Sequence, residues 1–344
     1  MPVADYETYC RMLDNAKENH FAYAAINVTS LTAANAVLKG LAESRSDGIV
    51  QVSTGGAAFA SGSAVNDMAL GAISIAEHVR RAAERYDIYV AIHTDHCQSK
   101  LLDSFVIPLI EETERRRAAG QPNLFNCHMF DGSELPLQQN LAKSRALLER
   151  CHKSELILEI ETGVVGGEED GVKTEGIPAE KLYTTTEDML AVAETLNSVK
   201  GARYLLAATF GNVHGVYKPG AVKLKPSILK EGQEAVEKAY GKGARLYLVF
   251  HGGSGSGADE INETLDYGVV KMNVDTDTQY AFTRPIADHM LKNYDGVLKV
   301  DGDVGSKKTY DPRVYLRLAE ASMAERVKKV VKTLRGEGTS LYKR

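Results

Sequence analysis

One unit recurs along this chain of 344 residues: a short apolar run rich in β-forming residues, a polar or glycine-bearing turn, and a longer stretch with helical periodicity. Between the second and third runs, for instance, apolar residues from Val65 to Tyr86 recur every three to four positions, as on one helix face. Such alternation predicts a parallel sheet with helical crossovers. The eight candidate strands are residues 21–28, 48–53, 88–95, 124–129, 156–163, 204–211, 246–253 and 269–276.

Eight repeats favour a (β/α)8 TIM barrel over an open doubly wound sheet, which usually has fewer strands and a glycine fingerprint after its first. The first strand here is followed by NVTSLT, which offers no such fingerprint. We expect one domain over residues 1–344, with an N-terminal helix in 1–18, a long loop at 164–185 and a C-terminal helical extension over 283–344. The last helix has an apolar face that would pack on the barrel or on a partner subunit, formed by Leu316, Ala319, Met323, Val327, Val330 and Leu334.

Charge and composition exclude several classes of protein. The formal net charge is −5 and no basic face stands out apart from the last helix, so no nucleic-acid partner is expected. The N-terminus lacks a basic region followed by an apolar run, and no stretch reaches the roughly 18 apolar residues of a membrane span. Four widely spaced cysteines predict reduced thiols without a disulfide framework. We therefore expect a cytoplasmic protein with no membrane partner.

Ionisable and amide side chains gather where the expected strands end. They are Asp95 and His96 after the third strand, Asp131 after the fourth, Glu159 and Glu161 late in the fifth, His214 after the sixth, His251 ending the seventh, and Asn273 and Asp275 ending the eighth. The carboxyl ends of barrel strands build the active site, although any one of these groups could be an ordinary cap or hydrogen-bonded polar residue. Together, His96, His214 and His251 could converge on one ion, and three nitrogen ligands with an open position suit catalytic Zn2+ or a similar metal. His93 lies one inward step deeper on the third strand, and we expect it to orient Asp95 and His96.

Two glycine- and hydroxyl-rich turns predict a phosphate site. HGGSGSG (251–257) precedes a helical pattern, and NVDTDT (273–278) follows the eighth strand, where barrels often hold phosphate. An ordinary helix N-cap would also explain Asp275 and Thr276. A third motif, VVGGEEDGV (164–172), could be a solvated turn or a mobile flap that makes Glu168 or Glu169 a metal ligand or base.

These motifs resemble those of class II, metal-dependent fructose-bisphosphate aldolases over nearly the whole chain. The matching segments are HTDHC (93–97), GGEEDG (166–171), FGNVHGVYKP (210–219), FHGGSGS (250–256) and MNVDTDTQ (272–279). The resemblance implies a TIM barrel that reversibly cleaves D-fructose 1,6-bisphosphate to dihydroxyacetone phosphate and D-glyceraldehyde 3-phosphate, in glycolysis and gluconeogenesis. Ala24 and Ala221 replace a proline and an asparagine common in the family, and neither is a proposed ligand.

The resemblance also implies roles for individual residues. His96, His214 and His251 match the ligands of the catalytic zinc, Asp95 matches the group that acts on the C4 hydroxyl, and Glu169 matches the proton-abstracting group. Asp131, Glu161 and Glu168 match positions that can hold a second metal, and a monovalent cation (Na+ or K+) is implied near the phosphate. The substrate and phosphate contacts would be Ser53, Gly215, Gly252, Ser254, Asn273, Asp275 and Thr276. Arg313 matches an arginine supplied by a neighbouring subunit, which implies a homodimer or homotetramer.

Other functions remain open from the residues alone. Lys271 has the same strand parity as Asn273 and could form a Schiff base in a metal-free aldolase. A barrel zinc hydrolase would resemble its relatives in an HxH pair on the first strand, which ends INV here. Tagatose-bisphosphate aldolase shares the zinc chemistry and differs in stereochemistry at C4, and a non-enzymatic binding role has no support in the sequence.

Overall fold

The computed structural model of the protein describes residues 2–163, 166–169, 172–173, 183–214, 224–253, 256–298 and 305–342, with only the backbone described at 166–169, 172–173 and 213–214. Eight parallel strands of the described chain form a closed barrel in the order β1-β11-β10-β8-β5-β4-β3-β2. The strands are β1 (Tyr23–Asn27), β2 (Gly48–Val52), β3 (Val90–Thr94), β4 (Cys127–Asp131), β5 (Ile157–Thr162), β8 (Tyr204–Ala208), β10 (Leu248–Phe250) and β11 (Val269–Val274). The predicted (β/α)8 fold class is confirmed.

The register closes the barrel between its first and last strands. Tyr23 pairs with Lys271 and Ala25 with Asn273, so β1 and β11 run side by side with their carboxyl ends at one mouth. Seven strands lie within the ranges expected from the sequence, and β4 extends two residues further to Asp131. Asp131 is therefore the last residue of a strand rather than a residue of the loop after it, because its backbone continues the pairing with Glu161.

A second, three-stranded sheet involves the segment that we expected to be a long loop. Its strands are β6 (Gly166–Glu169), β7 (Val172–Lys173) and β9 (Val213–His214), in the order β7-β6-β9. β6 and β7 pair as an antiparallel hairpin, and β6 pairs with β9 in parallel through Gly167 and His214. The loop expectation was incomplete here, because pairing with a strand distant in sequence cannot be inferred from a glycine-rich turn.

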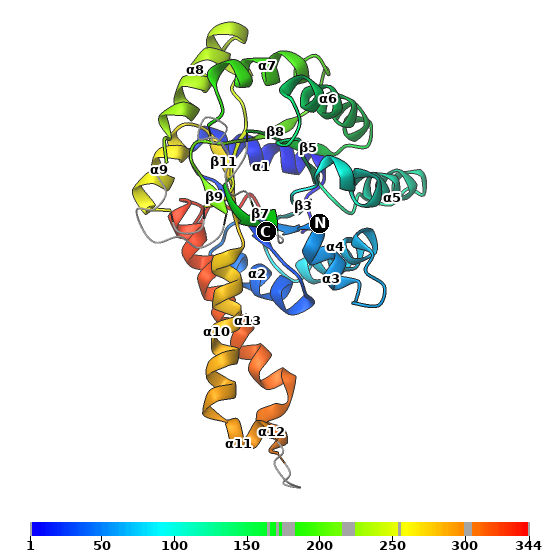
Figure 1. Ribbon diagram of the computed structural model, residues 1–344, viewed down its shortest axis with the longest axis vertical. Helices are drawn as coiled ribbons and strands as arrows, with labels where there is room; N and C mark the ends of the chain where they lie inside the picture. The colour runs from blue at the N-terminus through cyan, green and yellow to red at the C-terminus, as the bar shows by residue number, and fades with distance from the viewer. Residues whose placement is uncertain are drawn as a thin grey trace.

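Helices surround the barrel between successive strands (Figure 1). They are α2 (Leu31–Glu43), α3 (Thr54–Ala60), α4 (Met68–Ala83), α5 (Val106–Ala118), α6 (Leu137–Lys153), α7 (Thr186–Leu196), α8 (Ser227–Tyr240) and α9 (Ala258–Asp266), with short 3-10 turns at Ser99–Ser104 and Lys242–Ala244. Local sequence sets several of their starts. Ser30 caps α2 through the backbone N–H of Ala33, and Thr185 and Asp188 form a capping box at α7.

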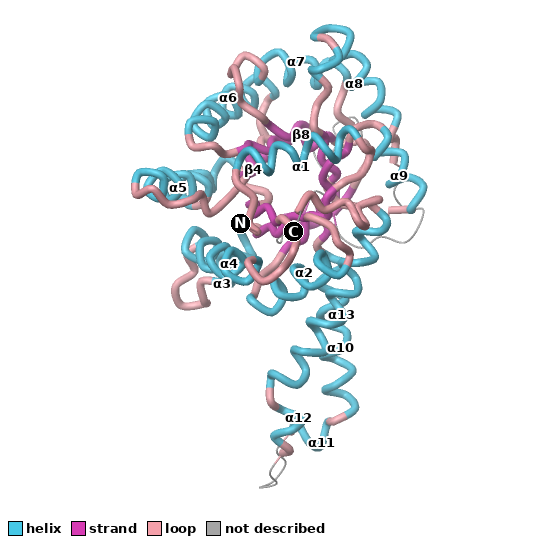
Figure 2. The backbone as a smooth tube through the Cα atoms, turned by 180° about the vertical axis from the view of Figure 1, so that it is seen from behind, coloured by secondary structure: helices cyan, strands magenta, loops and turns pink. Residues whose placement is uncertain are grey.

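The expected N-terminal helix is α1 (Tyr6–Glu18), and it lies across one end of the barrel, as Figure 2 shows. Its buried side chains, which include Tyr9, Met12 and Leu13, belong to the same apolar cluster as the inward-facing residues of the strands. Because α1 fills the end opposite the carboxyl ends of the strands, a ligand can approach only from the other mouth. This arrangement agrees with the usual position of barrel active sites.

The C-terminal extension forms a helical arm that projects from the barrel (Figures 1 and 2). It consists of α10 (Thr276–Lys292), α11 (Tyr294–Val297), α12 (Lys307–Tyr310) and α13 (Pro312–Thr333). The C-terminal half of α13 packs on α2, where a Cβ at Gly40 would lie 2.7 Å from Ala324 O. The expected apolar face of this last helix therefore does pack onto the barrel, and its buried residues include Ala319, Met323 and Val327.

Candidate active site

Asp95 lies directly after β3, buried at the mouth of the barrel, and two amide side chains hold it. Asn27 Nδ2 donates to Asp95 Oδ2 at 2.8 Å, and Asn273 Nδ2 donates to Oδ1 at 3.0 Å. Gln51 in turn donates to Asn27. Because each carboxylate oxygen accepts a hydrogen bond from a different strand, the carboxyl group is fixed in one orientation.

His96 faces two carboxylates on neighbouring strands. Its Nδ1 lies 3.4 Å from Asp131 Oδ2 and 3.2 Å from Glu161 Oε2. Adjacent placement of Asp131 and Glu161 follows from the pairing of β4 with β5, which sets these two residues side by side. An imidazole and two carboxylates thus meet at one edge of the mouth, and their ligand atoms all lie within 4.8 Å of one another.

His251 follows β10 and completes this group from the other side. Its ring packs edge-on against that of His96 with 4.6 Å between the centroids, and its Nδ1 lies 3.5 Å from Glu161 Oε2. Ligand atoms of Asp95, His96 and His251 also lie within 4.8 Å of one another. Glu161 therefore lies between His96 and His251, two expected ligands of the catalytic metal. The resemblance had assigned Glu161 to a separate, second metal site.

The environment shifts the titration of these carboxylates in opposite directions. Burial, followed by the nearby charge of Asp131, raises the pKa of Glu161. Burial also acts to raise the pKa of Asp131, but the hydrogen bond and charge of His96, together with the hydrogen bonds from Ser133, outweigh it, and the pKa lies well below its usual range. A buried cluster of anionic and imidazole groups is the chemical environment that a divalent cation stabilises, because the cation favours the ionised carboxylates.

Below the mouth lies a second layer of polar side chains inside the barrel. Glu159, two residues before Glu161 on β5, accepts from Lys271 Nζ at 2.7 Å and lies 2.8 Å from His251 Nε2. Burial raises the pKa of Glu159, but Lys271 and His251 outweigh it and hold the pKa well below its usual range. Lys271 does face inward as its parity predicted, but its ammonium is ion-paired. The contact with Glu159 thus engages the nitrogen that would have to be free to attack a carbonyl and form a Schiff base.

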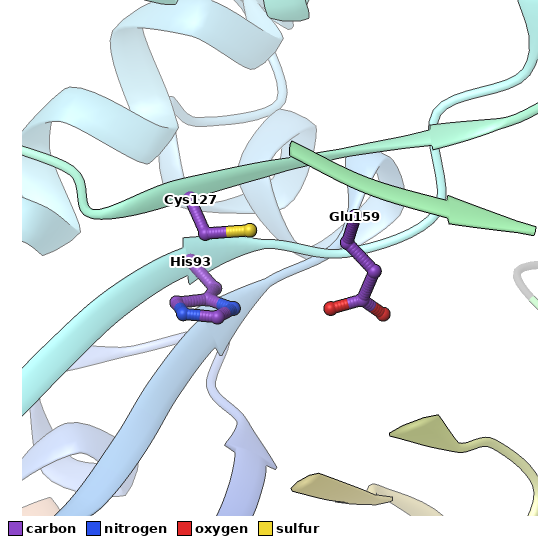
Figure 3. A group of neighbouring side chains, drawn as sticks. All are labelled: His93, Cys127 and Glu159. Atoms are coloured by element: carbon purple, nitrogen blue, oxygen red, sulfur yellow. The ribbon is translucent and has the colours of Figure 1, made fainter. Parts of the chain in front are cut away.

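His93 points into this same layer beside Cys127 and Glu159 (Figure 3). We expected His93 to orient Asp95 and His96, and this was wrong: within the described part of the chain neither ring nitrogen of His93 has a hydrogen-bond partner. Burial and the nearby Lys271 hold the pKa of His93 well below its usual range. The group of His93, Cys127 and Glu159 is a poor metal site, because the Lys271 ammonium already neutralises its one carboxylate.

The described residues that we expect to bind phosphate lie at or just after the carboxyl ends of barrel strands, and they are Ser53, Gly252, Asn273, Asp275 and Thr276. Ser53 caps α3 by accepting from the Gly56 N–H at 3.1 Å, and Gly252 has a φ of +63°, which favours glycine. Asp275 precedes α10, but its carboxylate accepts from the Gln279 side chain at 2.8 Å instead of capping the helix, and Thr276 is the first residue of α10. Asp275 is therefore the N-cap residue of α10 by position, as the alternative reading expected, but its side chain makes no capping hydrogen bond.

Several expected site residues cannot be placed in full. For His214, Glu168 and Glu169 the backbone is described and the side chains are not, while Gly215 and Ser254 lie outside the described residues. The pairing of β6 with β9 nevertheless brings the backbone of the GGEE segment beside that of His214. From the sequence, Asn27 was missed, and Glu159 was noted late in the fifth strand without being given a role. Their signal was available, because both are polar residues on the inward-facing side of a buried strand.

Comparison with known proteins identifies the family. The family model described as "Fructose-bisphosphate aldolase class-II" matches residues 7–339.

The chain belongs to the class II fructose-bisphosphate aldolase family.

Among similar curated proteins, the fructose-bisphosphate aldolase of Mycobacterium leprae (strain TN) is 56% identical over 344 residues, which cover 99% of each chain. That of Streptomyces galbus is 54% identical over 341 residues, covering 99% of this chain and 100% of the relative. The crystal structure of the Campylobacter jejuni fructose-bisphosphate aldolase is similar, with a TM-score of 0.86 and 39% identity over 98% of this chain and 96% of that chain.

Membership of the class II fructose-bisphosphate aldolases confirms the resemblance seen in the motifs. It also confirms the enzyme class, a carbon–carbon lyase that depends on a metal and acts on a sugar phosphate. Among the described residues, none of the helices combines the length and the apolar character of a membrane span.

Proposed function

We propose that this class II aldolase reversibly cleaves D-fructose 1,6-bisphosphate to dihydroxyacetone phosphate and D-glyceraldehyde 3-phosphate, as in glycolysis and gluconeogenesis. The observation that carries this proposal is the position of Asp95, a buried carboxylate fixed by two amides and within 4.8 Å of ligand atoms of His96 and His251.

A cytoplasmic location is supported by four buried free cysteines, because oxidising compartments favour disulfides.

The metal that we propose is Zn2+, held by His96, His251 and His214. The two described imidazoles, together with the adjacent Glu161, supply nitrogen and oxygen donors of the kind that zinc prefers. When bound, the metal would polarise the ketose oxygens and stabilise negative charge that develops on them. For a second divalent metal we propose Asp131, Glu161 and Glu168, since Asp131 and Glu161 both lie near His96 Nδ1.

Asp95 is the group that we assign to the C4 hydroxyl. In cleavage its carboxylate accepts the C4 proton as the C3–C4 bond breaks, and the amides of Asn27 and Asn273 keep it aimed at that proton. Glu169 then returns a proton to the carbon of the three-carbon product that was left by cleavage. The hairpin of β6 and β7 carries Glu169, and this hairpin would close over the mouth and exclude water.

The phosphate of the dihydroxyacetone half would lie among Ser53, Gly215, Gly252, Ser254, Asn273, Asp275 and Thr276, with a monovalent cation (Na+ or K+) nearby. The start of α10, a 17-residue helix, supplies backbone N–H groups and a favourable dipole for an anion at this place. Asn273 would serve both Asp95 and the substrate, because its amide already donates to that carboxylate.

A homodimer or homotetramer is supported by the projecting arm. Arg313 is the second residue of α13, which begins toward the end of the arm farthest from the barrel (Figure 1). Its side chain is 78% exposed, and its guanidinium donates to Asp311 at 2.6 Å. Large apolar side chains on the arm are also exposed, among them Leu291 at 79% and Tyr294 at 59%. A second copy that covers these side chains would bring Arg313 to the partner's substrate phosphate.

The experiment is cleavage of fructose 1,6-bisphosphate and of tagatose 1,6-bisphosphate by purified protein before chelation, after chelation, and after restoring Zn2+, Co2+ or Fe2+ separately. We expect activity on the fructose substrate that is lost with chelator and recovered with Zn2+. Preference for the tagatose substrate would overturn the sugar assignment. Activity that survives thorough chelation, together with inactivation by borohydride in the presence of substrate, would overturn the metal mechanism and implicate Lys271.

A further inference from the structure

A buried ion pair lies beneath the mouth of the barrel and contacts the candidate metal ligand His251. Glu159 on β5 accepts from Lys271 on β11 at 2.7 Å through Oε2, while its Oε1 lies 2.8 Å from His251 Nε2. All three side chains have no solvent-exposed surface. The reaction proposed above assigns no step to Glu159 or Lys271. Burial of two charged groups carries a desolvation penalty in free energy, and the reaction does not explain why this pair is present.

The two ring nitrogens of His251 face different parts of the site. Nε2 faces Glu159 in the lower layer, whereas Nδ1 lies 3.5 Å from Glu161 Oε2 on the side where the His96 ring packs. A carboxylate can only accept hydrogen bonds, so the proton between Glu159 and His251 resides on Nε2, and a metal would bind the ring through Nδ1. The lone pair of Nδ1 is then directed toward Glu161 and His96.

Lys271 restricts the carboxylate from the opposite side. Without the ammonium at Oε2, the Glu159 carboxylate could rotate about its last torsion, which is a broad one for glutamate. With the ammonium present, Glu159 Oε2 accepts a hydrogen bond from Lys271 while Oε1 contacts His251. The connection spans the barrel interior, because β8 and β10 separate β5 from β11 in the barrel order. It also lies one layer below the mouth, since Glu159 precedes Glu161, and Lys271 precedes Asn273, by two residues on their strands.

We propose that Glu159, held by Lys271, is a positioning residue that fixes the tautomer and orientation of His251 and so tightens metal binding at the mouth. Partners of this kind on metal-ligating histidines typically change metal affinity by about 10- to 100-fold when they are removed. This inference rests on the metal centre of the proposed function. Zn2+ binding by the wild-type protein tests that metal centre, and the comparison of Zn2+ binding between variants tests the role of Glu159.

The experiment measures the Zn2+ dissociation constant of the full-length protein by competition with a chromophoric chelator, and the visible absorption spectrum of the Co2+-loaded protein. The variants are Glu159→Gln and the double variant Glu159→Gln with Lys271→Met, which removes both charges of the pair and restores electrical balance in the core. Asp14→Asn is the matched control, because it breaks the ion pair between Asp14 on α1 and Arg203, which lies away from the mouth. Thermal unfolding of the metal-free proteins reports the stability of each variant.

We expect both Glu159 variants to bind Zn2+ about 10- to 100-fold more weakly and to change the Co2+ spectrum, while Asp14→Asn binds as the wild type does. In the double variant, stability should recover relative to Glu159→Gln while metal affinity does not. Recovery of metal affinity together with stability would overturn the inference, since the pair would then be only structural. Wild-type affinity in Glu159→Gln would overturn it as well. A wild-type protein that binds no divalent metal would overturn the proposed function itself.

Discussion

The side-chain amide of Asn273 donates to Asp95 Oδ1 across 3.0 Å, although 178 residues separate the two along the chain. Closure of the barrel creates this contact, because Asn273 is the next-to-last residue of the last strand and Asp95 follows the third. Asn27 on the first strand holds the other oxygen of the same carboxylate. The catalytic assignment of Asp95 thus depends on three strand ends that only the closed sheet brings together.

Replacement of Asp95 by alanine should abolish turnover and leave metal binding intact. A positioned acid or base contributes about 100- to 10,000-fold in rate, so we expect kcat to fall by that factor. Measurements of kcat and of bound zinc on the purified variant test this, with Asp103→Ala as the control because Asp103 is exposed and lies outside the site. A kcat near that of the wild type would contradict the role of Asp95.

Mixing two inactive variants should restore activity if Arg313 serves the neighbouring subunit. In a hybrid of Asp95→Ala and Arg313→Ala subunits, one site keeps its own Asp95 and receives Arg313 from the other chain. We expect co-expressed, differently tagged subunits to regain up to about half of the wild-type activity per hybrid dimer, because one of the two sites is then complete. Hybrids that stay as inactive as their parents would indicate that Arg313 acts on its own subunit or not at all.

The cysteines should be unreactive in the native protein. All four thiols are buried, and burial raises the pKa of Cys151 to about 12. At pH 8 the thiolate fraction of such a group is roughly one in 10,000, and the thiolate is the reactive form. Titration with a chromogenic disulfide reagent should therefore find almost no thiol in the folded protein and four in denaturant. Rapid modification of one thiol before unfolding would show that its burial is incomplete.

The ion pair between Asp14 on α1 and Arg203 should stabilise the fold at neutral pH and lose that effect in acid. Burial raises the pKa of Asp14, but the hydrogen bonds from Arg203 and Tyr247 outweigh it and lower the pKa. A lowered carboxyl pKa contributes stability above the unfolded value of about 3.9, and this contribution is lost as the pH falls through the folded value. Because the Asp14 side chain is 35% exposed, we expect only about 0.5 to 1 kcal/mol.

Urea unfolding of the wild type and of Asp14→Asn at pH 7, 5 and 3.5 measures this effect. The difference in unfolding free energy should be the same at pH 7 and pH 5 and should shrink at pH 3.5. An equal difference at all three pH values would mean that the hydrogen-bond geometry, rather than the charge of Asp14, provides the stabilisation.

The sequence by itself determined the fold class and much of the site. Eight apolar runs with helical stretches between them can bury their surface as a parallel barrel, and the carboxyl ends of its strands must then share one mouth. For this reason Asp95, His96 and His251 could be grouped before any distance was known, and the motifs around them indicated the family. The alternation of side chains along the eighth strand also correctly predicted that Lys271 faces the interior of the barrel.

Only the tertiary structure decided which of the inward-facing side chains contact one another. Parity fixes the side of the strand toward which a residue points, but it does not fix depth or partners across the barrel. From the sequence we expected His93 to orient Asp95 and His96, whereas the amides of Asn27 and Asn273 hold Asp95, and Glu159 contacts His251 instead. Lys271 was a possible nucleophile until its ion pair with Glu159 was seen. The pairing of β6 with β9 was equally hidden, because long-range backbone hydrogen bonds leave no periodic trace in a glycine-rich segment.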